Sequence, residues 1–443
     1  MITDMTVGNP ARILWKFSLP ILLSNIFQQF YNIADSVIVG KFVSEDALAA
    51  VGASYPIVMI FMAIAIGGNI GCSVVISQCF GAKEYSRMKT AVNTSLAAMA
   101  AVSAILMIFG FLNCVGMLRL LKTPDNILSD AEEYLNIYTG GLLFLFVYNI
   151  ATGAFTALGD SKTPLYFLIA SSVGNVILDL IFVIMFSMEV AGVAWATFIA
   201  QGIAAILAVF VLLKRLKKIK TEEKPLIFSW NLFAKITMVS MPSVLQQSFV
   251  SVGNLFIQAI VNSFGSSVIA GYSAAIKLNT FYVTSCSSFA SGLSSYTAQN
   301  IGARKKERIP KGFKVGIVMS LIVAVPFVIF YFFFSDTALK LFLKDSSVGA
   351  VSAGAVFLRI VSPFYLMIGI KLMSDSVLRG AGSMVTFTIS TFTDLVIRVV
   401  LAQFFSKTAG AVGIWWSWPI GWIAATVLSF GFYAIGVWKR DRV

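Results

Sequence analysis

The sequence predicts an all-α polytopic membrane protein with twelve transmembrane helices in two six-helix lobes. Three observations support this fold class: the composition, the recurrence of apolar segments, and a repeat that relates the two halves. Of the 443 residues, 58% are hydrophobic and 12% are charged, and the mean hydropathy is +0.87. Soluble domains carry about 25% charged residues. An ordinary soluble fold is therefore excluded.

Apolar segments long enough to cross a bilayer as helices recur along the whole chain. The first of them is longer than the core of a signal peptide and lacks a small-residue cleavage site, so we expect it to be retained. The predicted spans are 12–41, 47–79, 89–113, 130–158, 164–188, 191–213, 232–263, 267–300, 312–334, 347–379, 384–406 and 411–437.

Lys and Arg are distributed unequally between the two sides that these spans define. An even number of spans puts both termini on one side, which carries 23 Lys and Arg residues against 6 on the other. Cytoplasmic loops of membrane proteins are enriched in Lys and Arg. We therefore predict a plasma-membrane protein with both termini in the cytoplasm. This bias also explains the net charge of +13 without nucleic acid.

One long polar connection, 214–230, lies just before the midpoint of the chain. It predicts an N-terminal lobe over 1–213, a cytoplasmic linker over 214–231 and a C-terminal lobe over 232–443. Its basic residues could bind lipid or nucleic acid, but a solvated linker is favoured.

The second half of the chain repeats the first at an offset of about 222 residues. Pro20 aligns with Pro242, and the loop QCFGAK at 78–83 aligns with QNIGAR at 299–304. Each repeat holds six spans, so the two are parallel and related by a pseudo-two-fold axis along the membrane normal. Transporters of this build rock two lobes around a site near the midplane.

The N-terminal lobe carries two acids within its spans, Asp35 and Asp179, and no Lys or Arg there. An Asp at the bilayer centre costs roughly 2.5–3.5 kcal/mol. Asn175 precedes Asp179 by one helical turn, and Thr197 lies in the next span. Two carboxylates, an amide and a hydroxyl suit either Na⁺ or an exchangeable proton. The aligned position of Asp35 in the C-terminal lobe is Ile257, so the predicted cation site is confined to the first lobe.

The C-terminal lobe instead carries two acid–base pairs at i, i+4 spacing: Lys371 with Asp375, and Asp394 with Arg398. Such pairs can neutralise each other on one helix, or their cations can bind an anionic part of a substrate. Both interpretations remain open. Two further cations lack a partner at this spacing: Lys277 and Arg359.

Polar and aromatic side chains near these faces are candidates for a substrate cavity, because flat organic cations bind to aromatic rings. The candidate cavity residues are Gln28, Tyr31, Asn32, Tyr138, Asn149, Gln247, Asn254, Tyr272, Lys277, Lys371 and Arg398.

Enzyme chemistry finds no support in the sequence. Histidine is absent, and the four cysteines are scattered without metal-ligand or disulfide spacing. We therefore expect no cofactor and no metal beyond Na⁺ at Asp35, Asn175 and Asp179. The expected partners are a small-molecule substrate and the bilayer, with the chain as a monomer.

The chain resembles the multidrug and toxic compound extrusion (MATE) family, particularly its DinF-like branch, over its whole length. The matching features, in order, are Pro20, Asp35 and Val39-Gly40, the Gly-Ala-Lys loop at 81–83, the Gly159-Asp160 turn, Asn175-x-x-x-Asp179, and Thr197.

The resemblance implies an exporter of amphipathic, cationic organic compounds, driven by H⁺ or Na⁺. It implies a coupling site at Asp35, Asn175, Asp179 and Thr197, and a hinge at Pro20, which could equally be a simple kink. NorM-like members use an acid in span seven that this chain lacks. A flippase for lipid-linked oligosaccharides is the alternative, since that class shares the broader superfamily's build.

Overall fold

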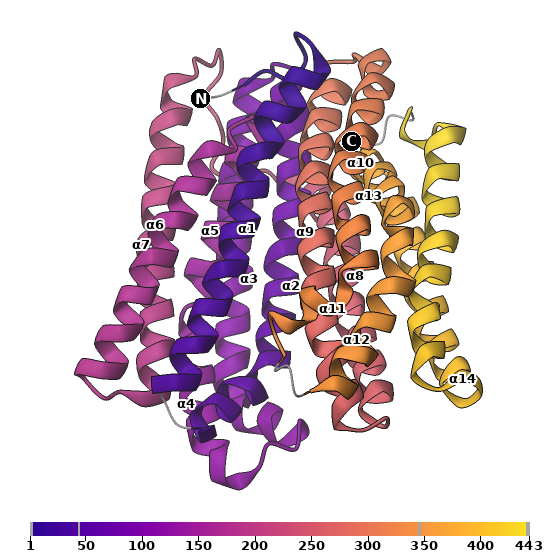
Figure 1. Ribbon diagram of the computed structural model, residues 1–443. Coiled ribbons are helices and arrows are strands. Elements are labelled where there is room, and N and C mark those ends of the chain that lie inside the picture. The colour runs from indigo at the N-terminus through magenta and orange to yellow at the C-terminus, as the bar shows by residue number, and fades with distance from the viewer. Residues whose placement is uncertain (1–2, 43–44, 344–346, 440–443) are drawn as a thin grey trace. The chain divides into compact units, whose positions relative to one another are not determined.

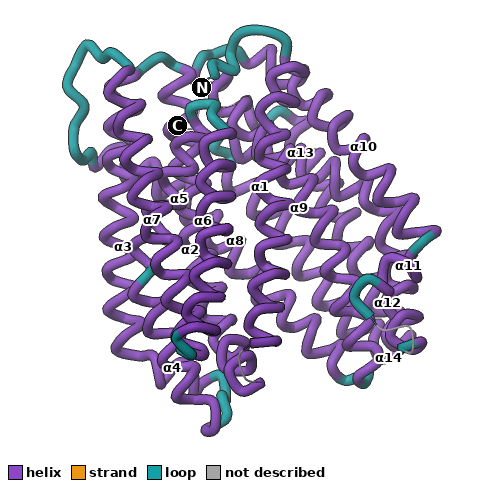
Figure 2. The backbone as a smooth tube through the Cα atoms, turned by 60° about the vertical axis from the view of Figure 1, so that its left-hand side comes forward, coloured by secondary structure: helices purple, strands orange, loops and turns teal. Residues whose placement is uncertain are grey.

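The computed structural model describes the backbone of residues 3–42, 45–343 and 347–439. It describes the side chains of these residues except at 32–42, 45, 46 and 48. The described elements are all helical, without a strand among them (Figures 1 and 2). The α-helices are α1 (Pro10–Phe42), α2 (Glu45–Gly81), α3 (Tyr85–Leu120), α4 (Asp125–Gly140), α5 (Leu142–Ala157), α6 (Lys162–Leu180), α7 (Glu189–Lys218), α8 (Trp230–Asn262), α9 (Ser266–Gly302), α10 (Ile309–Phe333), α11 (Ser335–Lys340), α12 (Val348–Val361), α13 (Tyr365–Gly380) and α14 (Met384–Ile435). Short π or 3₁₀ helices complete the set: η1 (Ile181–Met185), η2 (Lys306–Arg308), η3 (Ser362–Phe364) and η4 (Val437–Lys439).

The all-α polytopic fold class is confirmed. Eight helices in the described part of the chain are long and apolar enough to cross a membrane, or nine if the bent pair α4–α5 counts as one span. Each predicted span corresponds to a helix or a bent helix pair. The 52 residues of α14 would measure about 78 Å as one rod. The backbone breaks at Gly410, with φ 61° and ψ −148°, so α14 is two consecutive helices that match the last two predicted spans.

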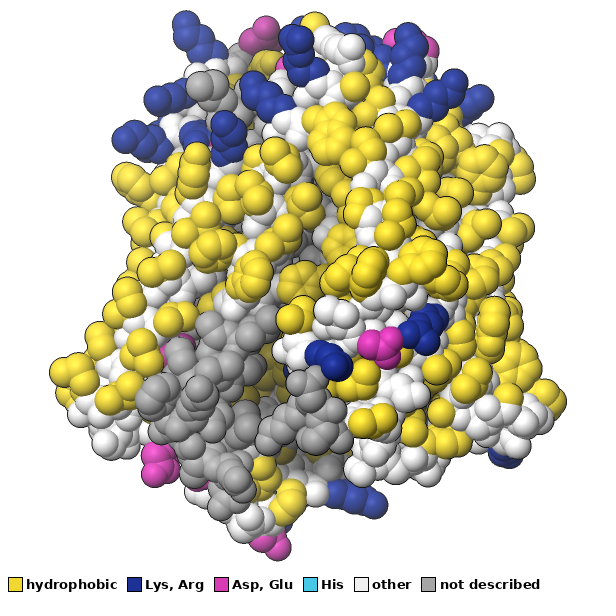
Figure 3. Space-filling model, in the orientation of Figure 1, with side chains coloured by type: hydrophobic (Ala, Val, Ile, Leu, Met, Phe, Trp, Pro, Cys, Tyr) yellow, Lys and Arg dark blue, Asp and Glu magenta, His cyan; other side chains and the backbone are white. Residues whose placement is uncertain are grey.

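On the face that Figure 3 shows, hydrophobic side chains cover a broad band of the described surface, and Lys and Arg gather most densely along its upper edge. This is the distribution of a protein whose helices are surrounded by lipid along their length.

The chain forms two compact units, and the boundaries between them fall inside α1 and α8. Unit 1 comprises Met1–Asp4 and Leu23–Leu245, and unit 2 comprises Met5–Leu22 and Gln246–Val443. Each unit therefore contains one half of α1 and one half of α8.

In unit 1, the first half of α8 packs directly on α2 through two glycines. A Cβ atom at Gly67 would lie 2.5 Å from the backbone nitrogen of Val244. A Cβ atom at Gly71 would lie 2.7 Å from the backbone nitrogen of Ser240. Small residues four apart allow two helix backbones to approach this closely inside a membrane. These glycines hold residues 230–245 in unit 1.

Unit 2 repeats this arrangement with the first half of α1 on α9. A Cβ atom at Gly292 would lie 2.1 Å from the hydroxyl of Ser18. The ring of Trp15 contacts that of Phe289 edge-on, with centroids 5.8 Å apart. Gly292 and Ser18 are the repeat counterparts of Gly71 and Ser240, which meet in unit 1. The internal repeat is thus visible in the packing.

The aligned loops also share an unusual backbone conformation. Lys83 and Arg304 both have positive φ, 62° and 57°, although neither is glycine. The amide after each of them bonds to the carbonyl five residues earlier, at 3.1 Å for Glu84 and 2.9 Å for Lys305. This is the hydrogen-bond pattern that ends a helix with a left-handed residue. The two aligned loops therefore terminate α2 and α9 in the same way.

Candidate functional site

Three helices of unit 1 bring predicted site residues into one hydrogen-bonded cluster. The Tyr31 hydroxyl on α1 donates to Oδ1 of Asn175 on α6. Nδ2 of Asn175 donates to the hydroxyl of Thr197 on α7 across 3.5 Å. Asn175 is only 3% exposed. Burial makes its hydrogen bonds expensive to lose, so the cluster fixes these three helices relative to one another.

Asp179 lies one helical turn after Asn175 on α6 and is 0% exposed. Directly after it the helix changes to the π-helix η1, Ile181–Met185. Single π turns occur often at functional sites. The predicted coupling residues Asn175 and Asp179 are thus buried inside unit 1, and Thr197 is half-buried. The side chains of Asp35 and Asn32 lie outside the described residues.

The Asp160 carboxylate fixes the start of α6, the helix that carries these residues. Its Oδ1 accepts the backbone amide of Thr163 at 3.1 Å, and its Oδ2 accepts the Thr163 hydroxyl at 2.8 Å. Oδ2 also forms an ion pair with Arg215 on α7. The Arg215 guanidinium lies 5.2 Å from the centroid of the Phe155 ring. The Gly159-Asp160 turn therefore sets the position of α6 against α7.

The interior next to this cluster is tightly packed. Tyr138, Thr197 and Gln201 line a cavity of only about 10 Å³. A cavity must hold about 10–15 Å³ of accessible volume to take one water molecule. A cavity of this size excludes an organic molecule.

Asn69 is a polar residue of this unit that the sequence reasoning missed. A Cβ atom at Gly153 on α5 would lie 1.8 Å from its Oδ1, so the amide of α2 fills the space that the glycine leaves. The signal was an amide directly after two glycines, Gly67 and Gly68, within the otherwise apolar segment 57–72.

In unit 2, Lys371 is bonded to its helical neighbour rather than free. Its Nζ donates to Oδ2 of Asp375 at 2.8 Å. Oδ1 of Asp375 accepts the hydroxyls of Ser390 at 2.9 Å and Ser429 at 2.5 Å. The acid is 3% exposed and the lysine 5%. This buried carboxylate already has three donors from α13 and from both parts of α14.

Arg398 is likewise paired with Asp394, and its guanidinium lies 4.3 Å from the centroid of the Trp418 ring. Arg359, which has no partner at helical spacing, reaches Asp336 at 2.5 Å. The ammonium of Lys277, an exposed residue, lies 5.9 Å from a ring centroid, that of Phe342. The acid–base pairs seen in the sequence are therefore formed.

The remaining candidate cavity residues are dispersed. Tyr272 is buried in unit 2 and stacks on Trp415, with ring centroids 5.1 Å apart. The Asn149 amide donates back to the carbonyl of Leu145 at 2.8 Å. Three others are half-buried or exposed on α1 and α8: Gln28, Gln247 and Asn254.

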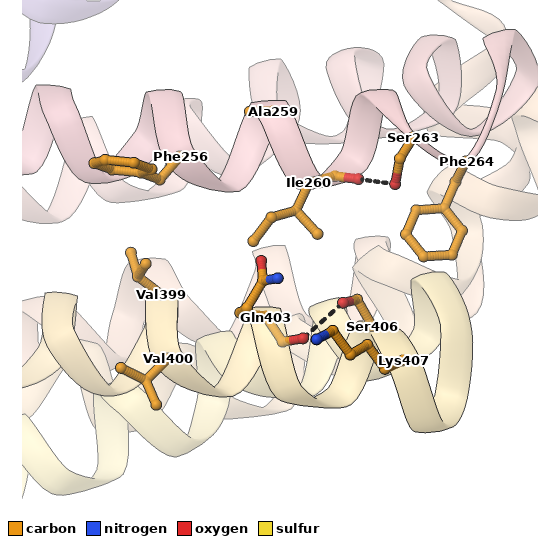
Figure 4. Close-up of a pocket in the computed structure, with 10 residues that line it drawn as sticks. All are labelled: Phe256, Ala259, Ile260, Ser263, Phe264, Val399, Val400, Gln403, Ser406 and Lys407. Atoms are coloured by element: carbon orange, nitrogen blue, oxygen red, sulfur yellow. Dashed lines mark hydrogen bonds between the residues drawn. The ribbon is translucent and has the colours of Figure 1, made fainter.

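A separate groove of about 760 Å³ opens in unit 2 between α8 and the first part of α14 (Figure 4). Its walls are apolar, and its polar residues gather toward one end around Lys407 (Figure 4). The hydroxyls of Ser263 and Ser406 each donate to a carbonyl of their own helix, at 2.7 and 2.9 Å. None of the predicted site residues lines this groove.

Two helical units built from one repeat, with a buried polar cluster inside one of them, define a membrane transporter of the two-lobe class. A family model described as MatE matches residues 20–181 and again 242–404. The chain therefore belongs to the MatE family. The two matched segments also confirm the internal repeat.

Relatives and solved structures agree with this assignment over the full chain. The chain is 29% identical to the probable multidrug resistance protein YpnP of Bacillus subtilis, covering 99% of this chain and 98% of that protein. It is 22% identical to the probable multidrug resistance protein NorM of Thermotoga maritima, covering 97% and 93%. An outward-facing multidrug resistance MATE family transporter has a TM-score of 0.91 at 22% identity, covering 99% of this chain and 98% of that chain. This last likeness concerns the fold alone.

Proposed function

We propose that this protein is a secondary active antiporter that exports amphipathic, cationic organic compounds in exchange for H⁺ or Na⁺. The ion would bind in unit 1 at Asp35, Asn175, Asp179 and Thr197. The names of the relatives, multidrug resistance proteins, support the substrate class.

The observation that carries the proposal is the buried position of Asp179 in helices without a fixed cation. The segments 20–40, 164–188 and 191–213 contain no Lys or Arg. A buried carboxylate is stable when it is protonated or when it binds a cation. With Asp35 on α1 as a second acid and no Lys or Arg in these segments, we infer that an exchangeable cation from solution balances the charge of the two acids.

The coupling is expected to act through α1. This helix runs from unit 2 into unit 1 with its division at Leu22 and Leu23, and Pro20 lies two residues before that division. Proline removes a backbone hydrogen bond and weakens a helix locally. Binding or loss of the ion near Asp35 would bend α1 at this proline and expose the substrate site to one side at a time. One charge moving through 100 mV supplies about 2.3 kcal/mol for export.

Efflux from proteoliposomes tests the proposal, first under a pure pH gradient and then under a pure Na⁺ gradient. We expect Asp179→Asn and Asp35→Asn to abolish gradient-driven efflux under the gradient that drives the wild type. Substrate binding at equilibrium should persist. Asp336→Asn is the matched control, because Asp336 is exposed and pairs with Arg359 in unit 2. Normal efflux by Asp179→Asn would contradict the ion site.

The flippase alternative is not favoured, because the relatives named above are multidrug resistance proteins. It also requires a strongly cationic cavity for a pyrophosphate, whereas Lys371, Arg398 and Arg359 each pair with an acid. We further propose a monomer with both termini in the cytoplasm, as the asymmetry of Lys and Arg indicates.

A further inference from the structure

The connection between α7 and α8 is held along α3 by hydrogen bonds. Residues 214–218 belong to α7, and the chain from 219 onward runs along α3. Nζ of Lys89 donates to the carbonyl of Ile219 at 2.7 Å. The amide of Leu226 donates to the Thr90 hydroxyl at 3.0 Å. The amide of Ser229 donates to the hydroxyl of Thr94, one turn further along α3, at 3.1 Å. All of these residues lie in unit 1.

This ordered connection exposes large apolar side chains. Leu226 is 59% exposed, Ile227 82% and Trp230 75%. The Trp230 ring contacts Phe228 and Phe233, with centroids 5.0 and 5.7 Å apart. A polar loop surrounded by water would not expose these three large apolar side chains together. Tryptophan and aliphatic side chains beside basic residues are typical of a segment that lies in the membrane interface.

A basic pocket of about 390 Å³ lies beside this segment. Three lysines line it from two helices: Lys89 on α3, and Lys214 and Lys217 on α7. The remaining lining residues are Asn93, Phe210, Leu213, Leu216 and Pro225. Phe210 and Leu213 are themselves exposed, so the apolar wall continues from the lysines onto the outer surface of α7.

We propose that this pocket binds an anionic phospholipid of the leaflet on the connection's side. Lys214 and Lys217 would hold the headgroup phosphate, and an acyl chain would lie along Phe210 and Leu213. An alternative is that the lysines at this helix end only extend their ammonium groups into water and bind no lipid. Lysines that extend into water do not explain why the neighbouring connection is hydrogen-bonded to α3 and exposes apolar side chains.

Charge and shape together select a lipid over a soluble anion. Basic pockets between transmembrane helices at the cytoplasmic side are suited to anionic headgroups. The two acids of the connection, Glu222 and Glu223, do not line the pocket. A soluble phosphate would leave the apolar wall and the exposed connection in water, whereas a phospholipid covers both.

Native mass spectrometry of the purified full-length protein tests the proposal, with phosphatidylglycerol and phosphatidylcholine as the two lipids. The test variant is Lys214→Gln/Lys217→Gln. The control, Lys311→Gln/Lys314→Gln, removes two exposed lysines at the same i, i+3 spacing from the start of α10. Lys89 is left intact because its amine holds Ile219.

The wild type and the control should bind phosphatidylglycerol in preference to phosphatidylcholine. The test variant should bind it about 30-fold more weakly, which corresponds to about 1 kcal/mol for each lysine. Equal binding by the test and control variants would overturn the proposal. So would displacement of the lipid by millimolar inorganic phosphate, because the site would then be one for a soluble anion.

Tryptophan fluorescence in vesicles gives an independent readout. Trp230 should be quenched by phospholipids brominated near the headgroup end of the acyl chain, and Trp230→Phe should lose that share of the quenching. If the wild type and Trp230→Phe are quenched alike, the connection does not lie in the interface and the proposal fails.

Discussion

Replacement of Lys371 by methionine isolates the energy of the buried ion pair in unit 2. Methionine keeps the length of the side chain but leaves the Asp375 carboxylate without its cation. At the observed 2.8 Å, with an effective dielectric constant of about 20, the lost attraction is about 6 kcal/mol. Desolvation of both groups offsets part of it, and loss of one partner of a buried pair costs about 3–5 kcal/mol. We expect the unfolding free energy of Lys371→Met to be about 3–5 kcal/mol lower than that of the wild type.

Removal of the acid as well should restore most of this stability. In Lys371→Met/Asp375→Leu both charges of this pair are removed, and apolar replacement of a whole buried pair is often neutral or stabilising. Two hydroxyls lose an acceptor, but that of Ser390 keeps the carbonyl of Phe387 at 2.9 Å. We expect the double variant to lie within about 1–2 kcal/mol of the wild type, since each hydrogen bond contributes about 1 kcal/mol.

Unfolding in detergent, titrated with a denaturing surfactant and followed by circular dichroism, measures both variants. Arg359→Gln is the control, because its pair with Asp336 is about half exposed and such pairs contribute about 0–1 kcal/mol. If Lys371→Met costs less than Arg359→Gln, the carboxylate is not ionised in the folded protein and the reasoning is wrong.

Two further predictions concern unit 1. Gly71→Val should lower the thermal unfolding temperature, because even a Cβ atom there would meet the backbone of α8 at 2.7 Å and overpacking costs about 1–3 kcal/mol. Gly116→Val on α3 is the control, because nothing lies within 4 Å of its Cβ position, and equal shifts in the two variants would contradict the close contact. Tyr31→Phe should raise the half-saturating concentration of the coupling ion about 5- to 150-fold, because Asn175 loses a buried donor worth about 1–3 kcal/mol. Ion-dependent efflux rates measure this effect, and an unchanged half-saturation would separate Tyr31 from the ion site.

The fold class could be predicted because apolar length and composition determine membrane-spanning helices almost by themselves. The division of α1 and α8 between the two units could not be predicted from the sequence. It depends on the close approach of α2 and α8 at Gly67 and Gly71, and a hydropathy pattern does not distinguish glycine at a helix contact from glycine elsewhere. Only the repeat, which aligned Pro20 with Pro242, indicated that the two helices are equivalent.

The candidate site was predictable where polar residues share a helical face. Spacing placed Asn175 beside Asp179, and adjacent spans brought Thr197 to them. The bond from Tyr31 joins α1 to α6, which are far apart in sequence, so spacing could not indicate it. The hydrogen bonds that hold the connection before α8 to Thr90 and Thr94 could not be predicted either, because they depend on backbone geometry and not on composition.

The shared helices have a consequence for biosynthesis. A ribosome that has made residues 1–229 has produced α1 to α7, yet the surface of α2 around Gly67 and Gly71 still lacks residues 230–245 of unit 1. Domains usually fold in order as they emerge, but here the first unit must wait for the start of the second repeat. Residues 5–22, the first helical segment to be synthesised, wait longer still for α9. Two fragments cut at the connection would each be incomplete, and we expect them to fold only when expressed together.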